Sequence, residues 1–166
     1  MDRLIHDLYK YKIIQIKKTE LKNGLIVPFH INLLKIFDYP VILENFLCEL
    51  NNFIIENKIS YSCIFGKNDF CKNICTLLSY KFNFKNIIRE NLHSYKDGKD
   101  KYECLLIKEN MGSSSRTNKL IKTLDSFNVG VCNSLSLINY NTGKTLNEPC
   151  YFFDTYRILQ VLYKNE

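Results

Sequence analysis

The chain has 166 residues, the length of one folded domain, which excludes a multidomain assembly. Apolar residues make up 46% of the sequence and aromatic residues 13%, so we expect a packed core and exclude an intrinsically disordered chain. The formal net charge of +6 suits a phosphate-bearing ligand or a nucleic acid but requires neither.

The first part of the chain predicts a helix followed by a hairpin and a longer helix. Hydrophobic spacing and turn residues give, in chain order, a helix over 4–12, a strand over 13–16, a turn at 21–24, a strand over 26–33 and a helix over 40–54. Pro28 favours a sheet edge for the second strand. We expect Asp38 to cap the long helix and Pro40 to lie in its first turn.

The rest of the chain alternates short apolar strands with amphipathic helices. The expected elements are strand 61–65, helix 70–78, strand 87–89, polar loop 90–101, strand 104–107, helix 120–127, strand 129–138, strand 150–153 and a closing helix. We expect Asp154 to cap the closing helix and Tyr156, Leu159 and Leu162 to face inward. This alternation predicts an α/β domain with a central parallel sheet flanked by helices.

The residue usage limits what charge can say about function. The chain has no Ala and no Trp, and only four Arg accompany nineteen Lys, nineteen Asn and nineteen Ile. Codons rich in A and T produce this usage, which favours an AT-rich genome, viral or protist. Lysines are therefore weak evidence for a binding site in this sequence.

Targeting and metal signals are absent from the sequence. No segment resembles a signal peptide or approaches the ~20 apolar residues of a membrane span, so we expect a cytoplasmic protein, in the host cytoplasm if viral, with no membrane partner. The seven Cys include no CxxC pair, and the three His have no ligand-like spacing. We expect reduced, mostly buried thiols and no metal site.

One strand-to-helix turn has the chemistry of a phosphate site. In open α/β sheets, ligands bind beyond the carboxyl ends of the strands, where helix N-termini face an anion. The strand over 104–107 leads into a glycine and three hydroxyls, followed by an arginine, and the candidate phosphate-binding residues are Gly112, Ser113, Ser114, Ser115 and Arg116. The alternative is an ordinary serine helix cap.

Several motifs extend over the whole chain and carry a family resemblance. Leu21-Lys22-Asn23-Gly24 begins it, residues 63–70 fall at a pyrophosphate loop, Lys96-Asp97-Gly98 at a mobile catalytic loop, and residues 105–115 at a ribose 5-phosphate signature. In this pattern the chain resembles the type I phosphoribosyltransferases, in particular the orotate phosphoribosyltransferase family. The resemblance implies a single domain with a small hood from residues 1–35 and an α/β core over 36–166. It also implies a homodimer, since the family lends its mobile loop across a two-fold interface.

The sequence departs from this family at the positions that carry its chemistry. Lys108-Glu109 stands where the family has two consecutive acids, and Ser114 replaces the inner glycine of the signature. Tyr140 replaces the arginine expected to hold the orotate carboxylate. Lys22, Lys96 and Glu109 remain as vestigial catalytic candidates.

Three interpretations of function follow. The first is a catalytically degenerate homologue, possessing no cofactor and retained as a protein-interaction or structural factor. The second is a divergent phosphoribosyltransferase that uses Glu109 and moves ribose 5-phosphate from magnesium-bound phosphoribosyl diphosphate to a nucleobase. The third is a nucleotide- or phosphate-binding module built on the turn over 112–115.

Under the first interpretation, another protein is the main partner and binds at the mouth of the former active site. The candidate interface residues are Phe29, His30, Phe65, Lys67, Phe70, Tyr95 and Tyr140. The alternative is that these aromatics fill the vacated pocket. Nucleic acid ranks lower as a partner because the lysines are spread along the chain.

Overall fold

The computed structural model describes residues 1–21, 24–110, 114–140 and 150–164. Its first half contains α1 (Asp2–Lys10), β1 (Ile14–Glu20), β2 (Ile26–Ile31), the 3₁₀ helix η1 (Leu33–Asp38), α2 (Pro40–Glu56), β3 (Cys63–Gly66) and α3 (Asp69–Phe82). Its second half contains the 3₁₀ helix η2 (Arg89–Tyr95), β4 (Tyr102–Asn110), α4 (Ser114–Asp125), β5 (Val129–Asn139), β6 (Cys150–Asp154) and α5 (Thr155–Tyr163).

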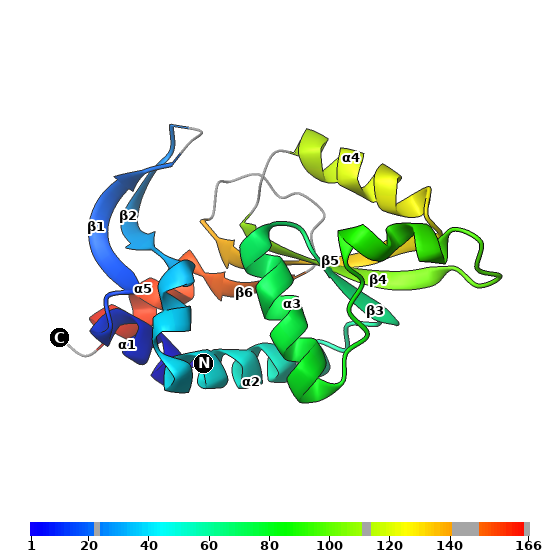
Figure 1. Cartoon of the computed structure of the whole chain (residues 1–166). Helices are drawn as coiled ribbons and strands as arrows, with labels where there is room; N and C mark the ends of the chain where they lie inside the picture. Colours follow the sequence, from blue (N-terminus) through cyan, green and yellow to red (C-terminus); the bar gives the residue numbers. More distant parts are fainter. Residues whose placement is uncertain (22–23, 111–113, 141–149, 165–166) are drawn as a thin grey trace.

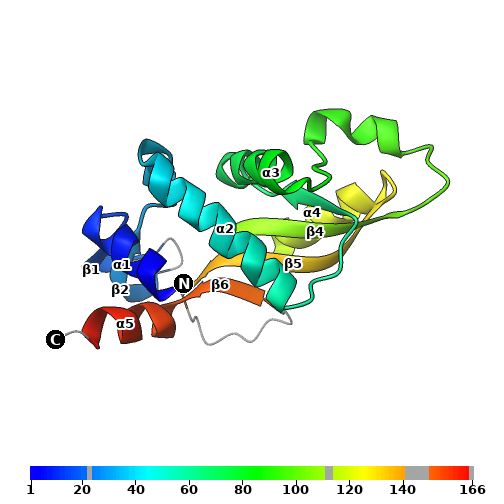
Figure 2. The same ribbon diagram turned by 90° about the horizontal axis from the view of Figure 1, so that it is seen from below.

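A four-stranded parallel sheet forms the centre of the molecule, with strand order β3-β4-β5-β6. The segment after α3 touches the outer edge of β3 through a single parallel bridge between Ile64 and Asn86. Helices cover both faces of the sheet, and α2 and α4 lie on opposite sides of it (Figures 1 and 2). The predicted α/β architecture is confirmed.

Side-chain alternation along the central strands divides the core in two. Leu105 and Ile107 of β4 belong to a first core cluster with α1, α2, α3 and the β1–β2 ribbon. Cys104 and Leu106 face the other way, into a second core cluster with η2 and α4. The sheet is therefore buried on both faces, as a parallel sheet requires.

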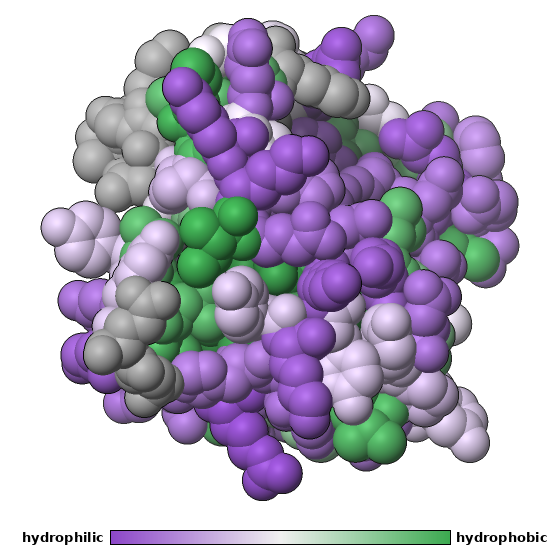
Figure 3. Space-filling model, turned by 90° about the vertical axis from the view of Figure 1, so that its left-hand side faces the viewer, coloured by the Kyte–Doolittle hydropathy of each residue, from purple (hydrophilic) through white to green (hydrophobic). Residues whose placement is uncertain are grey.

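The segment predicted to form the hood contains α1 and a separate antiparallel ribbon of β1 and β2. The ribbon lies with α1 and α5 at one end of the sheet (Figure 1). Seen from that end, the surface is mostly hydrophilic, with an apolar area near its centre (Figure 3). Exposed Ile16 and Ile26 belong to the ribbon.

Three sequence predictions about local structure are wrong. Asp38 does not cap α2, because it ends η1 and the cap position is Tyr39, which makes no side-chain cap bond. No strand forms over 87–89: a single bridge is made just before it, by Asn86, and the chain then turns into η2 and buries Leu92. Tyr156 is 66% exposed because α5 presents Thr155, Ile158 and Val161 to the core instead.

The cysteines whose side chains the structure describes are all free thiols. Cys63, Cys71, Cys75 and Cys104 are buried, whereas Cys48 is half-buried and Cys132 is exposed. Within the described ranges, no helix has the length and apolarity needed to cross a membrane.

Candidate functional site

The strand order places a topological switch point between β3 and β4. After β3 the chain passes through α3 to Asn86, which bridges to the outer side of β3. After β4 the chain passes through α4 to β5, which pairs on the other side of β4. Connections that leave two neighbouring strands in opposite directions mark the place where ligands bind in open α/β sheets. The residues that follow β3 and β4 are therefore the candidate site.

The turn after β3 is held tightly against α3. A Cβ on Gly66 would lie 2.4 Å from backbone atoms of Cys71 and Lys72, so only glycine fits there. Asn68 caps α3, with its Oδ1 accepting a hydrogen bond of 2.9 Å from the backbone N–H of Cys71. This geometry fixes the direction in which the side chains of Lys67 and Asn68 leave the turn.

The end of β4 places one cation and one acid on opposite faces of the sheet. Lys108 follows the residues of the second core cluster in the alternation and is 1% exposed, beside the equally buried Ser136 on β5. Glu109 lies on the other face and is half-buried. The lysine that replaces an acid in the family pattern is thus part of the interior.

Two side-chain hydrogen bonds join the ends of β3 and β4 to each other and to α4. Lys67 Nζ donates to Thr117 Oγ1 at 2.9 Å, and Thr117 is a buried residue of α4. Asn68 Nδ2 donates to Glu109 Oε2 at 2.8 Å. The switch point is therefore bridged by the protein's own side chains.

Tyr140 and Phe29 form a stacked pair beside this site. Their ring centroids are 5.9 Å apart with an interplanar angle of 25°. Burial raises the pKa of Tyr140 to about 12, and the negative charge of Glu109 adds to the shift. The same two causes, in the same order, raise the pKa of the Cys71 thiol to about 12. Glu109 thus lies close enough to both groups to act on them electrostatically.

The structure does not gather the predicted interface residues on one surface. Phe29, Phe65 and Phe70 are buried, and Phe65 and Phe70 belong to different core clusters. These three rings are part of the two hydrophobic core clusters. His30 is exposed and Lys67 is half-buried in its bond to Thr117.

Tyr95 and Lys96 lie near the start of β4, whereas Glu109 lies near its end. Tyr95 packs edge-on against Tyr102, the first residue of β4, with centroids 5.1 Å apart. The backbone of the following loop is held by Asn128 Nδ2, which donates to the carbonyls of Gly98 at 3.1 Å and Asp100 at 2.8 Å. β4 has nine residues, so at ~3.3 Å per residue its two ends are roughly 25 Å apart.

The remaining predicted residues have a partial description. Lys22, Gly112 and Ser113 lie outside the described residues, and for Ser114 only the backbone at the start of α4 is described. Ser115 and Arg116 are exposed in the first turn of α4. Asn68 and Thr117 are not among the residues predicted from the sequence. An Asn directly before a helical pattern is a cap signal that identifies Asn68, whereas no local pattern singles out Thr117.

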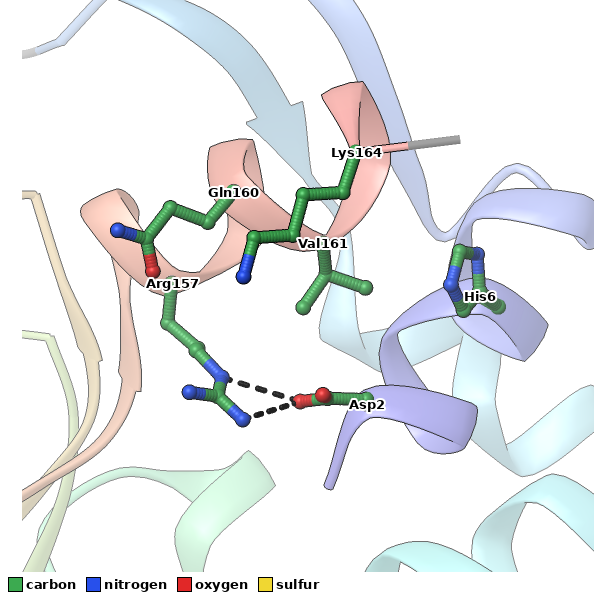
Figure 4. Close-up of a pocket in the computed structure, with 6 residues that line it drawn as sticks. All are labelled: Asp2, His6, Arg157, Gln160, Val161 and Lys164. Carbon is green, nitrogen blue, oxygen red and sulfur yellow. Dashed lines mark hydrogen bonds and ion pairs between the residues drawn. The ribbon is translucent and has the colours of Figure 1, made fainter. Parts of the chain in front are cut away.

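Two hollows are lined by residues other than those that bridge the switch point. One, of about 490 Å³, separates η2 from α4. The other, of about 190 Å³, lies between α1 and α5, where Arg157 donates to Asp2 through Nε at 3.0 Å and Nη2 at 2.6 Å (Figure 4). Among the described residues, no three His, Cys, Asp or Glu side chains are grouped as metal ligands.

Neither protein-family models nor curated protein sequences match the chain. Solved structures do. Orotate phosphoribosyltransferase from Aeropyrum pernix superimposes with a TM-score of 0.74 at 15% identity, over 96% of this chain and 98% of the other. The chain has the fold of the type I phosphoribosyltransferases, and it is similar to the orotate phosphoribosyltransferases among them.

Two further structures support this type I phosphoribosyltransferase fold. The Francisella tularensis orotate phosphoribosyltransferase gives a TM-score of 0.71 at 17% identity, over 98% of this chain and 86% of the other. Leishmania donovani UMP synthase gives 0.76 at 16% identity over 99% of this chain, which spans 38% of that protein. The predicted fold family is confirmed.

Proposed function

We propose that this protein is a catalytically degenerate phosphoribosyltransferase homologue that acts by binding a partner. The observation that carries the proposal is the bridged switch point. Lys67 and Asn68, from the turn at which the resemblance locates the pyrophosphate loop, are bonded to Thr117 and Glu109. A diphosphate entering between β3 and β4 has to break both bonds.

The charge at the end of β4 also supports the proposal. The resemblance implies two carboxylates there, which would stabilise positive charge developing on the ribose, but this chain has one, Glu109. Removing one preorganised electrostatic group costs about 10²–10³ in rate. Lys108, which takes the place of the second acid, is buried on the opposite face of the sheet and cannot supply the missing negative charge.

The switch point offers a magnesium-bound diphosphate only one carboxylate from the end of β4, that of Glu109. Mg²⁺ in phosphate sites is held by one or two carboxylates, and the single carboxylate at the end of β4 is already hydrogen-bonded to Asn68. The lysine-rich loop over 96–101 cannot supply charge for the diphosphate within one chain, because Asn128 holds its backbone near the start of β4, at the other end of the strand from Glu109.

The deciding experiment is a turnover assay with the purified protein. Phosphoribosyl diphosphate and magnesium are supplied with orotate, uracil, adenine, guanine or hypoxanthine, and pyrophosphate release is followed beside an authentic orotate phosphoribosyltransferase as positive control. We expect no release above the protein-free blank. Release that disappears in Glu109→Ala would establish the divergent enzyme instead.

The phosphate-binding interpretation is separated by calorimetry. Inorganic phosphate is titrated into the wild-type protein and into Ser115→Ala, which changes an exposed residue at the start of α4. Heat that is lost in the variant would favour a phosphate-binding module, and no heat in either protein is the result that the proposed function predicts.

A further inference from the structure

The groove between η2 and α4 is the larger of the two hollows and differs in chemistry from the bridged switch point. The residues that line it are Arg89, Leu92, His93, Arg116, Lys119, Leu120, Thr123 and Phe127. At about 490 Å³ it has the size of a small-ligand site, and it lies on the face of the sheet that carries the second core cluster.

The groove is lined by cations that no described residue neutralises. Arg89, Arg116 and Lys119 are exposed, and none of them pairs with an acid in the described part of the chain. No Asp or Glu is among the lining residues. In the hollow between α1 and α5, by contrast, Arg157 is neutralised by Asp2 (Figure 4).

The two arginines carry more weight than the lysine. AT-rich codon usage explains abundant Lys, but the chain has only four Arg, and two of them line this groove. The planar guanidinium group binds phosphate oxygens through paired hydrogen bonds, whereas an ammonium group acts as a point charge. The groove is therefore suited to phosphate groups.

Several of the residues that line the groove lie in a row along α4. Arg116, Lys119 and Thr123 follow one another at three- and four-residue steps, so they share one face of α4. The helical rise of 1.5 Å per residue spreads them over roughly 10 Å, which is longer than a single phosphate group. A half-buried ring, Phe127, packs edge-on against His93 with centroids 4.9 Å apart at 80°.

The burial of the leucines that line the groove distinguishes between an acidic peptide and a nucleic acid as the partner. An acidic amphipathic peptide needs accessible apolar area for its anchor residues. Leu92 and Leu120 are only 3% and 8% exposed, so the floor offers such anchors little area. A row of cations beside the half-buried ring of Phe127 matches single-stranded nucleic acid, whose phosphates need charge and whose bases stack on rings.

We propose that the groove between η2 and α4 binds single-stranded nucleic acid, with Arg89, Arg116 and Lys119 on the phosphates and Phe127 against a base. This inference rests on the proposed binding role, for which it names the ligand. Its test contains no phosphoribosyl diphosphate, so pyrophosphate release in the turnover assay would contradict the proposed function and leave the binding result unaffected.

The test measures fluorescence anisotropy with labelled twelve-nucleotide oligo(U) and oligo(dT) at several salt concentrations. The groove variant carries Arg89→Gln, Arg116→Gln and Lys119→Gln. A control variant, Arg3→Gln, Lys17→Gln and Lys18→Gln, removes the same total charge from exposed residues of α1 and β1. Circular dichroism confirms that both variants fold.

We expect the groove variant to bind at least tenfold more weakly and the control variant within about twofold of wild type. The plot of log K against log salt falls with a slope whose magnitude is about 0.7 per phosphate contact. The groove variant loses three such contacts, so the magnitude of its slope should be smaller by about 2. Phe127→Leu should weaken binding about fivefold or more.

The proposal is overturned if wild type binds neither oligonucleotide at low salt, or if the control variant loses as much affinity as the groove variant. Capture of a protein that the groove variant fails to retain, without oligonucleotide binding, would assign the groove to a protein partner instead.

Discussion

Replacing Asn68 with Ala removes two hydrogen bonds that belong to different parts of the site. One is the cap of α3, where Asn68 Oδ1 accepts from the N–H of Cys71 at 2.9 Å. The other is the 2.8 Å bond from Asn68 Nδ2 to Glu109. The side chain is therefore both a local helix cap and a bridge between β3 and β4.

The structure sets the size of the expected effect. Loss of an Asn cap costs about 1 kcal/mol. The bond to Glu109 lies at the surface, so solvent screening limits its contribution to about 0.5–1 kcal/mol. The sum is about 1.5–2 kcal/mol, which for a chain of this length lowers the melting temperature by about 3–8 °C.

Urea unfolding of matched variants separates the two bonds. Ser caps a helix about as well as Asn but is too short to reach Glu109, so Asn68→Ser should lose only the bridging contribution. Glu109→Ala should cost the same amount, and the double variant Asn68→Ser, Glu109→Ala should cost no more than either. Equal midpoints for Asn68→Ala and wild type would refute the bridge and the cap together. Equal losses in Asn68→Ser and Asn68→Ala would refute the cap alone.

Three other predictions test the packing around the site. Gly66→Ala should lower the free energy of unfolding by about 3 kcal/mol, because the new Cβ would lie 2.4 Å from backbone atoms. Gly24→Ala should lower it by only about 1 kcal/mol, because Gly24 has a φ of +79° but open space around it. Thermal unfolding of both variants measures the difference. Because the pKa of Tyr140 is raised from 10.0 to about 12, the folded state holds its proton more tightly, so wild type should lose stability relative to Tyr140→Phe as pH rises from 10 to 12. Urea unfolding at a series of pH values measures this difference, and a constant difference would contradict it. Iodoacetamide followed by peptide mass spectrometry should modify exposed Cys132 in the native protein and buried Cys104 only after unfolding, and early labelling of Cys104 would show that the sheet opens.

Local patterns determined most of the elements. Helical spacing after Pro40 predicted α2, because a long amphipathic period and a first-turn proline act within the segment itself. The apolar run that ends at Gly66 predicted β3 in the same way. The family resemblance, carried by motifs over the whole chain, gave the right fold although the three solved structures described above share only 15–17% identity.

Interactions between distant segments decided the candidate site. The replacement of an acid by Lys108 was visible in the sequence, but the burial of that lysine depends on the pairing of β4 with β5. Thr117 accepts its bond from a residue fifty positions earlier, so no local pattern identifies it. The aromatic interface was predicted from residue type, and the structure buries Phe65 and Phe70 on opposite faces of the sheet because ring burial is set by the packed layers.

The groove shows the same division between sequence and structure. Scarce arginine is a property of the sequence, and it made any clustering of Arg informative. Arg89 and Arg116 lie far apart along the chain, however, and only the packing of η2 and α4 on the same face of the sheet brings them to one groove. Composition determined which side chains were available, and tertiary structure decided which of them share a surface, because helices that are distant in sequence become neighbours only when both bury their apolar faces against the same strands.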